Sequence, residues 1–80
     1  MGRVFFPEQR LANAIVLQAA KDYRIILYRL QYDSKDMGAI NEKKRIENFF
    51  HSSWYELLTD VDADYILKGI ENKVQRRMTT

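Results

Sequence analysis

The chain has 80 residues, of which 46% are hydrophobic and 30% are charged, with three glycines and one proline. This composition is typical of a folded domain and excludes a disordered tail, a collagen-like chain and a flexible linker. Because the chain has no cysteine, it can form no disulfide framework, thiolate zinc site or cysteine nucleophile. A chain this short buries only a small core, and a partner often adds to its stability.

The net charge is small, but its distribution along the chain is uneven. Thirteen Lys and Arg residues against eleven Asp and Glu residues give +2, which argues neither for nor against nucleic acid. Residues 1–31 carry five basic and two acidic groups, residues 32–62 four and seven, and residues 63–80 four and two. The chain is therefore basic at both ends and acidic in the middle, a pattern that can orient a partner or reflect helix-end preferences.

Residues 7–32 are predicted to form the first and longest helix. Pro7 suits the first turn of a helix, and Glu8 favours the positive end of the helix dipole. Apolar residues then recur at spacings of three and four, at Leu11, Ile15, Ala19, Tyr23, Ile26 and Leu30, with Ala12, Val16, Ala20 and Leu27 beside them. The stripe is as broad as a central helix requires, and the length favours packing of part of the helix on another chain.

A second helix is predicted over residues 38–51, after the polar connection that follows Tyr32. Either Ser34 or Asp36 could cap its first turn. Its inward residues are expected to be Ala39, Ile46, Phe49 and Phe50. Four of its charged residues, Glu42, Lys43, Lys44 and Glu47, are expected to lie largely in water.

Two more helices are predicted, a short one over residues 53–59 and a longer one over residues 62–77. Ser53 and Glu56 have the spacing of a capping box, and this helix is expected to bury Trp54, Leu57 and Leu58. Asp62 is the expected cap of the last helix, whose apolar stripe is Ile66, Leu67, Ile70, Val74 and Met78. The prediction is a single all-α domain over residues 1–80, a small bundle of three longer helices plus one short helix.

The residues that could carry chemistry do not form a convincing site. The acidic residues Asp60, Asp62, Asp64 and Glu71 have calcium-loop spacing, but Tyr65 stands where the loop needs glycine and the following residues favour a helix. The one histidine, His51, has no second histidine or cysteine to share a metal and no well-placed nucleophile. We therefore predict no catalytic residue, no metal and no cofactor, which disfavours an enzyme.

A row of basic and aromatic residues is the most informative surface feature. Arg10, Lys21, Arg24 and Tyr28 are predicted on the less apolar side of the first helix, with Arg29 and Tyr32 close by. Arginine and tyrosine are enriched at protein interfaces, and they also bind phosphates and stack on bases. The alternatives are a solvated face whose tyrosines cover core edges and, for nucleic acid, a second cluster at Lys68, Lys73, Arg76 and Arg77.

Two segments together resemble a pattern found in small uncharacterised proteins of phages and prophages of Gram-positive bacteria. The first contains Asp22-Tyr23-Arg24, and the second runs from Ile46 to Asp62 through Phe49-Phe50, Ser52-Ser53-Trp54 and Leu58-Thr59-Asp60. The resemblance covers about residues 12–77 and departs from the pattern at Ala63, where glycine is expected. It implies a phage origin and the cytoplasm of an infected bacterium, and it carries over no functional residues.

The apolar runs are far shorter than the roughly 20 residues of a membrane span, and no secretory signal precedes them.

Two functions follow as hypotheses. The leading hypothesis is a non-enzymatic accessory protein that binds a host or phage protein through Arg24, Tyr28 and Tyr32, or acts as a homodimer, and inhibits or redirects a host or defence enzyme. The alternative is a small DNA-binding protein, although Asp60, Asp62 and Asp64 at the start of its recognition helix would repel phosphates.

Overall fold

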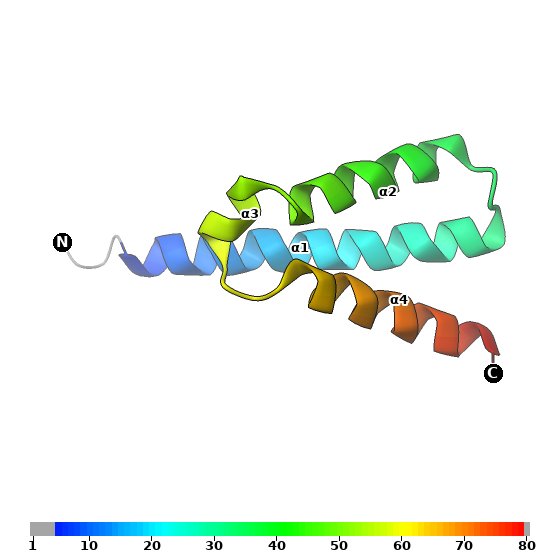
Figure 1. Ribbon diagram of the computed structural model, residues 1–80. Helices are drawn as coiled ribbons and strands as arrows, with labels where there is room; N and C mark the ends of the chain where they lie inside the picture. The colour runs from blue at the N-terminus through cyan, green and yellow to red at the C-terminus, as the bar shows by residue number, and fades with distance from the viewer. Residues whose placement is uncertain (1–4, 80) are drawn as a thin grey trace.

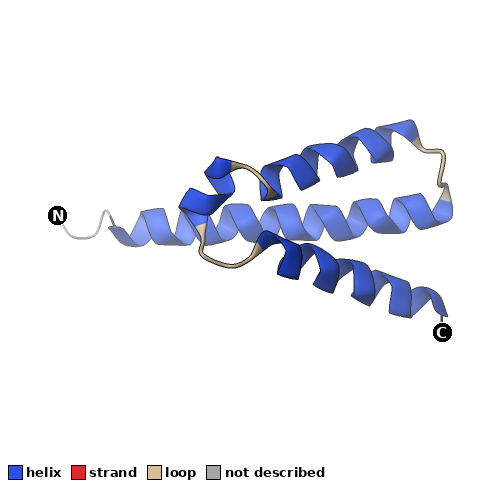
Figure 2. Cartoon of the chain, viewed as in Figure 1, coloured by secondary structure: helices blue, strands red, loops and turns tan. Residues whose placement is uncertain are grey.

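The computed structural model describes the backbone of residues 5–79 and the side chains of residues 10–76. It contains α1 (Phe5–Tyr32), α2 (Met37–Phe50), α3 (Ser53–Leu58) and α4 (Ala63–Thr79), joined by short connections (Figures 1 and 2). All regular secondary structure in the described residues is helical, which confirms the predicted all-α bundle. The helix α1 starts at Phe5, so Pro7 stands within the first turn, where the missing N–H leaves no hydrogen bond unmade.

Two aspartates start the second and fourth helices through local hydrogen bonds. The carboxylate of Asp36 accepts a hydrogen bond from the backbone N–H of Ala39 over 3.1 Å, so Asp36 caps α2. The carboxylate of Asp62 accepts from the N–H of Asp64 over 3.2 Å at the start of α4, in agreement with the predicted cap. The predicted stripe residue Met78 and the basic Arg77 belong to α4, but their side chains lie outside the described residues.

The capping box predicted at Ser53 is wrong, because Ser52 caps α3. The Ser52 hydroxyl accepts a hydrogen bond from the N–H of Tyr55 over 3.2 Å and donates one to the carbonyl of Phe49 over 2.6 Å. One hydroxyl therefore bonds an N–H at the start of α3 and a carbonyl at the end of α2 that also accepts the backbone N–H of Ser52. The physical reason for the shift by one residue is that Ser52, with extended backbone angles, lies three residues before the N–H of Tyr55 that its hydroxyl bonds.

The burial of α3 also differs from the prediction. The side chains of Trp54 and Leu57 are 54% and 80% exposed, whereas Tyr55 is buried. The Tyr55 ring packs edge-on against Phe49, and its hydroxyl donates to the carbonyl of Val61 over 2.8 Å. Tyr55 is thus the aromatic residue of α3 whose polar end finds a partner when buried, as buried tyrosines require.

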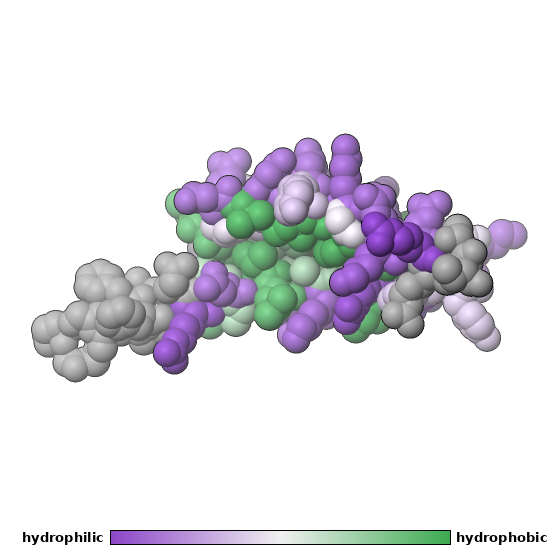
Figure 3. Space-filling view, turned by 90° about the horizontal axis from the view of Figure 1, so that it is seen from below, coloured by the Kyte–Doolittle hydropathy of each residue, from purple (hydrophilic) through white to green (hydrophobic). Residues whose placement is uncertain are grey.

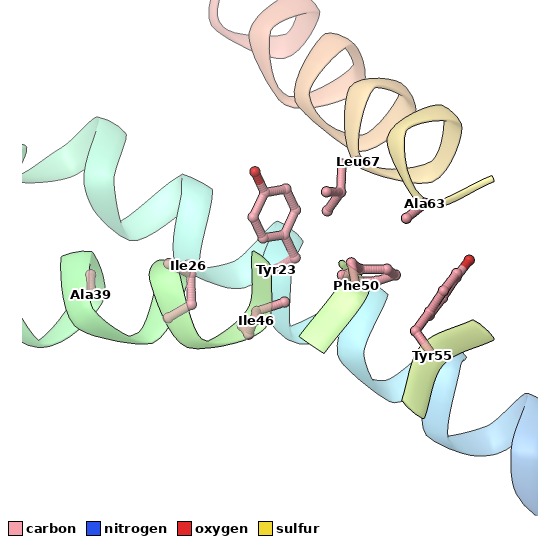
Figure 4. Packing of buried hydrophobic residues seen from close by; sticks show 8 residues of the cluster. All are labelled: Tyr23, Ile26, Ala39, Ile46, Phe50, Tyr55, Ala63 and Leu67. Carbon is pink, nitrogen blue, oxygen red and sulfur yellow. The ribbon is translucent and has the colours of Figure 1, made fainter. Parts of the chain in front are cut away.

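The core lies where α1, α2 and α4 meet, with α3 closing one end. Tyr23 and Phe50 are its largest fully buried side chains, and the cluster also contains Ile26, Ala39, Ile46, Tyr55, Ala63 and Leu67. Leu67 of α4 points toward Tyr23, and Phe50 lies between Tyr23 and Tyr55 (Figure 4). Most of the predicted stripes of α1, α2 and α4 are buried or half-buried here, but Leu11 is 62% exposed.

The arrangement leaves one side of the longest helix uncovered. The chain runs along α1, returns along α2, turns through α3 and runs forward again along α4 (Figure 1). Both α2 and α4 lie on the same side of α1, and α1 has 28 residues against 14 and 17 for these partners. Over residues 10–32, the opposite face of α1 therefore receives no cover from the described part of the chain.

Candidate functional site

The exposed face of α1 is the most extended candidate site. Arg10, Leu17, Lys21, Arg24 and Tyr28 follow one another at spacings of seven, four, three and four residues, which places them on one side of a helix. The buried residues Tyr23 and Ile26 occupy the opposite side. We call this surface the α1 outer face and define it by Arg10, Ala14, Leu17, Lys21, Arg24, Ile25, Tyr28 and Tyr32.

The α1 outer face mixes apolar and basic groups. Leu17, Ile25 and Tyr32 are 57%, 53% and 95% exposed, and Tyr28 is half-buried. The cations Arg10, Lys21 and Arg24 are exposed between them. The one carboxylate of α1 with a described side chain, Asp22, lies at the border of this face and accepts a hydrogen bond from Gln18 over 2.9 Å. The face therefore presents positive charge with exposed apolar side chains, a composition that suits an acidic, amphipathic surface.

Five of the six residues predicted for protein binding lie on this face, and Arg29 does not. Arg10, Lys21, Arg24, Tyr28 and Tyr32 share it, whereas the Arg29 guanidinium donates to the Asp36 carboxylate over 2.9 Å. The N–H of Ala39 and the Arg29 guanidinium together hold the pKa of Asp36 below its usual value. Arg29 thus stabilises the connection between α1 and α2.

Sequence reasoning missed Leu17 and Ile25 as members of this face. Apolar residues occupy several sides of this helix, so the exposure of these two residues was not evident from the chain alone. The signal that could have found them is their spacing from Lys21, since Leu17 lies one turn before it and Ile25 one turn after it, on the side away from Tyr23.

The basic residues of the second cluster do not form one continuous surface on α4. Lys68 and Lys73 are five residues apart, which separates their directions by about 140° around a helix. Both line a shallow hollow of about 610 Å³ beside Gly69, but the carboxylates of Asp62 and Asp64 line it as well. Arg76 is exposed on α4, and the side chain of Arg77 lies outside the described residues. These acids oppose phosphate binding along α4.

A cleft of about 350 Å³ lies between α2 and α4, over the last turns of α1. Its walls come from three helices: Leu27, Leu30 and Gln31 of α1, Lys43 of α2, and Glu71, Val74 and Gln75 of α4. The Gln31 amide donates to the backbone carbonyl of Val74 over 3.4 Å and links two of these walls. The cleft is small, and its lining offers a single cation and a single carboxylate.

Beside this cleft, one tyrosine joins the three long helices. The Tyr23 hydroxyl lies 2.9 Å from a carboxylate oxygen of Glu47 on α2 and 2.8 Å from one of Glu71 on α4. A phenol has one hydrogen, so it donates to one carboxylate at a time. The Lys43 ammonium group bonds the same Glu47 oxygen over 2.8 Å and offsets the repulsion between the two acids.

The pKa values around Tyr23 follow from this geometry. Burial, then the hydrogen bonds to Glu71 and Glu47, raise the pKa of Tyr23 far above its usual value, so the phenol keeps its proton. Partial desolvation acts to raise the pKa of Glu47, but the hydrogen bonds from Lys43 and Tyr23 outweigh it, and the net pKa is lowered. These shifts favour a structural tie over a proton-transfer site, because neither group is poised to titrate near neutral pH.

His51 joins the end of α2 to the start of α4. Its Nε2 lies 2.9 Å from a carboxylate oxygen of Asp64, and its Nδ1 lies 3.0 Å from the backbone carbonyl of Glu47. Only the doubly protonated ring can donate from both nitrogens, so the Asp64 carboxylate and the Glu47 carbonyl raise the pKa of His51. A histidine that bonds in this way has no free nitrogen to activate a nucleophile.

Three of the four acidic residues with calcium-loop spacing each form a hydrogen bond with a different partner. Asp62 caps α4, Asp64 bonds His51, and Glu71 bonds Tyr23, so these three carboxylates point to different partners. Among the described residues, histidine and acidic side chains form no group of three that could hold a metal ion.

Over residues 5–79, none of the helices combines the length and the apolar character that crossing a membrane requires. Comparisons of the chain with protein-family models, curated proteins and solved structures gave no match.

Proposed function

We propose that this chain is a phage accessory protein that acts in the bacterial cytoplasm by binding a host or phage protein through the α1 outer face. The observation that carries the proposal is the uncovered face of a 28-residue helix, with Arg10, Lys21 and Arg24 among exposed Leu17 and Ile25. Partially exposed apolar side chains on a rigid helix supply binding energy on burial, and the cations select and orient an acidic partner. The expected outcome of binding is inhibition or redirection of an enzyme.

Several observations favour a protein over DNA as the partner. The apolar residues of the α1 outer face gain little from contact with phosphates, whereas they gain from burial against another apolar surface. The basic residues of α4 share their hollow with two carboxylates, which would approach the phosphates of a bound duplex.

The test is affinity capture from lysates of Gram-positive bacteria with matched variants. The test variant combines Arg24→Glu with Tyr28→Ala on the α1 outer face, and the control combines Lys44→Glu with Asn41→Ala on exposed positions of α2. A protein that the wild type and the control retain should be lost at least about tenfold by the test variant, which corresponds to about 1.4 kcal/mol. Circular dichroism checks that each variant keeps its helical content.

Two results would count against the proposal. If the Arg24→Glu, Tyr28→Ala variant retains every captured protein, the α1 outer face is not the binding surface. If the chain instead binds duplex DNA with micromolar affinity that falls steeply between about 50 and 200 mM salt, and Lys68→Glu with Lys73→Glu abolishes that binding, the DNA-binding alternative is correct.

A further inference from the structure

A second exposed apolar surface lies at the α3 end of the bundle. Trp54, Leu57, Val61 and Tyr65 are 54%, 80%, 46% and 76% exposed. They occupy α3, the connection after it and the first turn of α4. Seen from below, hydrophobic residues gather on the face beneath this connection and the start of α4 (Figure 3). We call this surface the α3 cap and define it by Trp54, Glu56, Leu57, Asp60, Val61 and Tyr65.

The α3 cap is acidic where the α1 outer face is basic. Glu56 and Asp60 are exposed between its apolar side chains, with Asp62 and Asp64 next to them. A hollow of about 400 Å³ opens here, lined by Glu56, Asp60, Asp62, Asp64 and His51, with the buried Phe50, Tyr55 and Ala63 among its walls. Asp64 bonds His51 and Asp62 caps α4, so Glu56 and Asp60 are the carboxylates that face a docked cation. An arginine or lysine side chain fits such a hollow, because its hydrocarbon stem packs on apolar walls while its charge meets carboxylates.

The two surfaces of one chain therefore complement each other in charge and in apolar content. We propose that the α3 cap of one copy docks on the α1 outer face of a second copy, so that the chain associates head to tail. This inference rests on the proposed function in that it assigns an occupant to the same α1 outer face. A partner protein would compete with the second copy for that face.

Charge also disfavours the simpler arrangement in which two α1 outer faces pack on each other. Such a symmetric dimer would bring Arg10, Lys21 and Arg24 of both copies together with few acids between them. Like charges across an interface are repulsive, so that pairing loses the electrostatic contribution that the head-to-tail pairing gains. A head-to-tail contact is heterologous, and it extends into open chains unless its rotation closes a ring.

The experiment uses two variants that each disable one surface. Lys21→Glu with Arg24→Glu reverses the charge of the α1 outer face, and Glu56→Lys with Asp60→Lys reverses that of the α3 cap. The side chains of all four residues are exposed, so the fold should tolerate the changes. The control, Lys35→Glu with Lys44→Glu, makes the charge change of the first variant away from both surfaces. Leu57→Ser disables the cap without changing its charge.

Sedimentation equilibrium from about 10 μM to about 1 mM gives the expected results. The mass of the wild type and of the control should rise with concentration above the 9.5 kDa of one chain, and added salt should reverse the rise. Each charge-reversed variant, and Leu57→Ser, should stay near the mass of one chain. An equimolar mixture of the two charge-reversed variants should associate again, because the intact cap of one fits the intact α1 outer face of the other and the two reversed surfaces are also opposite in charge.

Fluorescence provides a second readout, since Trp54 is the one tryptophan of the chain and belongs to the cap. Its emission should shift to shorter wavelength with concentration in the wild type and in the mixture, but not in either variant alone. The inference is overturned if the wild type stays monomeric throughout, if it stops at a dimer, or if the mixture stays monomeric. Because the cap variants keep the α1 outer face intact, they should still capture the partner protein, so failure of self-association and failure of the proposed function give different results.

Discussion

At the scale of single residues, Tyr23 connects the three long helices. Its ring is fully buried, and its hydroxyl contacts Glu47 of α2 and Glu71 of α4 from its place on α1. A hydrogen bond to a charged group contributes about 1.5–3 kcal/mol when it is made in a partly buried place. The same hydroxyl also lies between the two carboxylates and supplies a hydrogen-bond donor to them.

Replacing Tyr23 with Phe should therefore lower the free energy of unfolding by about 1–2 kcal/mol, less than the full value because Glu71 is exposed and regains water. Urea denaturation followed by circular dichroism measures the change. Adding Glu71→Gln to Tyr23→Phe should recover part of the loss, because it removes one of the two opposed charges. A Tyr23→Phe variant as stable as the wild type would show that the hydroxyl contributes nothing to the packing of the three helices.

At the scale of the helices, Gly69 makes α4 less stable than an alanine at the same position would. This glycine lies within the helix, and a Cβ atom added to it would meet no other atom within 4 Å. The structure therefore gives no support to a close helix crossing at Gly69 among the described residues. A glycine inside a helix costs about 0.5–1 kcal/mol relative to alanine, because the unfolded glycine has more conformations to lose.

The substitution Gly69→Ala should raise the free energy of unfolding by about 0.5–1 kcal/mol, visible as a higher urea midpoint with an unchanged slope. Gly38→Ala is the comparison, because its added Cβ would lie 3.4 Å from the Asp36 carboxylate in the first turn of α2 and should gain less. Destabilisation by Gly69→Ala would mean that another segment packs closely on this side of α4.

At the scale of the whole molecule, three charged groups give the stability an expected dependence on pH. The pKa values of Asp36 and Glu47 are lowered from 3.8 and 4.5, so their contributions are present above those values and are lost as the pH falls through the lowered ones. The pKa of His51 is raised from 6.5, so its contribution is complete below 6.5 and is lost as the pH rises through the raised value.

The free energy of unfolding should consequently be highest between pH 4.5 and pH 6.5 and should decline on both sides. Urea denaturation across this range measures the profile, and His51→Gln is the matched variant. The variant should lose the decline on the alkaline side while keeping the decline on the acid side. An alkaline decline of the same size in the variant would place its origin in groups other than the pair of His51 and Asp64.

Much of the fold was predictable because it depends on neighbours along the chain. The spacing of apolar residues predicted the long helices, and local hydrogen bonds at Asp36 and Asp62 place two helix starts as expected. The short α3 was predicted less well. A helix of six residues has too few positions to define a stripe, so the spacing of its residues did not indicate that Tyr55, and not Trp54, lies inside.

The sequence by itself determined the class of fold, the positions of the helices and the 3–4 spacing that gathers Lys21, Arg24 and Tyr28 on one side of α1, since each of these follows from residues within a few turns of one another. Tertiary structure alone decided that α2 and α4 cover the same side of α1, and so which apolar residues stay exposed. It also decided that Glu47 and Glu71 meet at Tyr23. These acids lie 24 and 48 positions from Tyr23, and contacts over such separations depend on how whole helices pack.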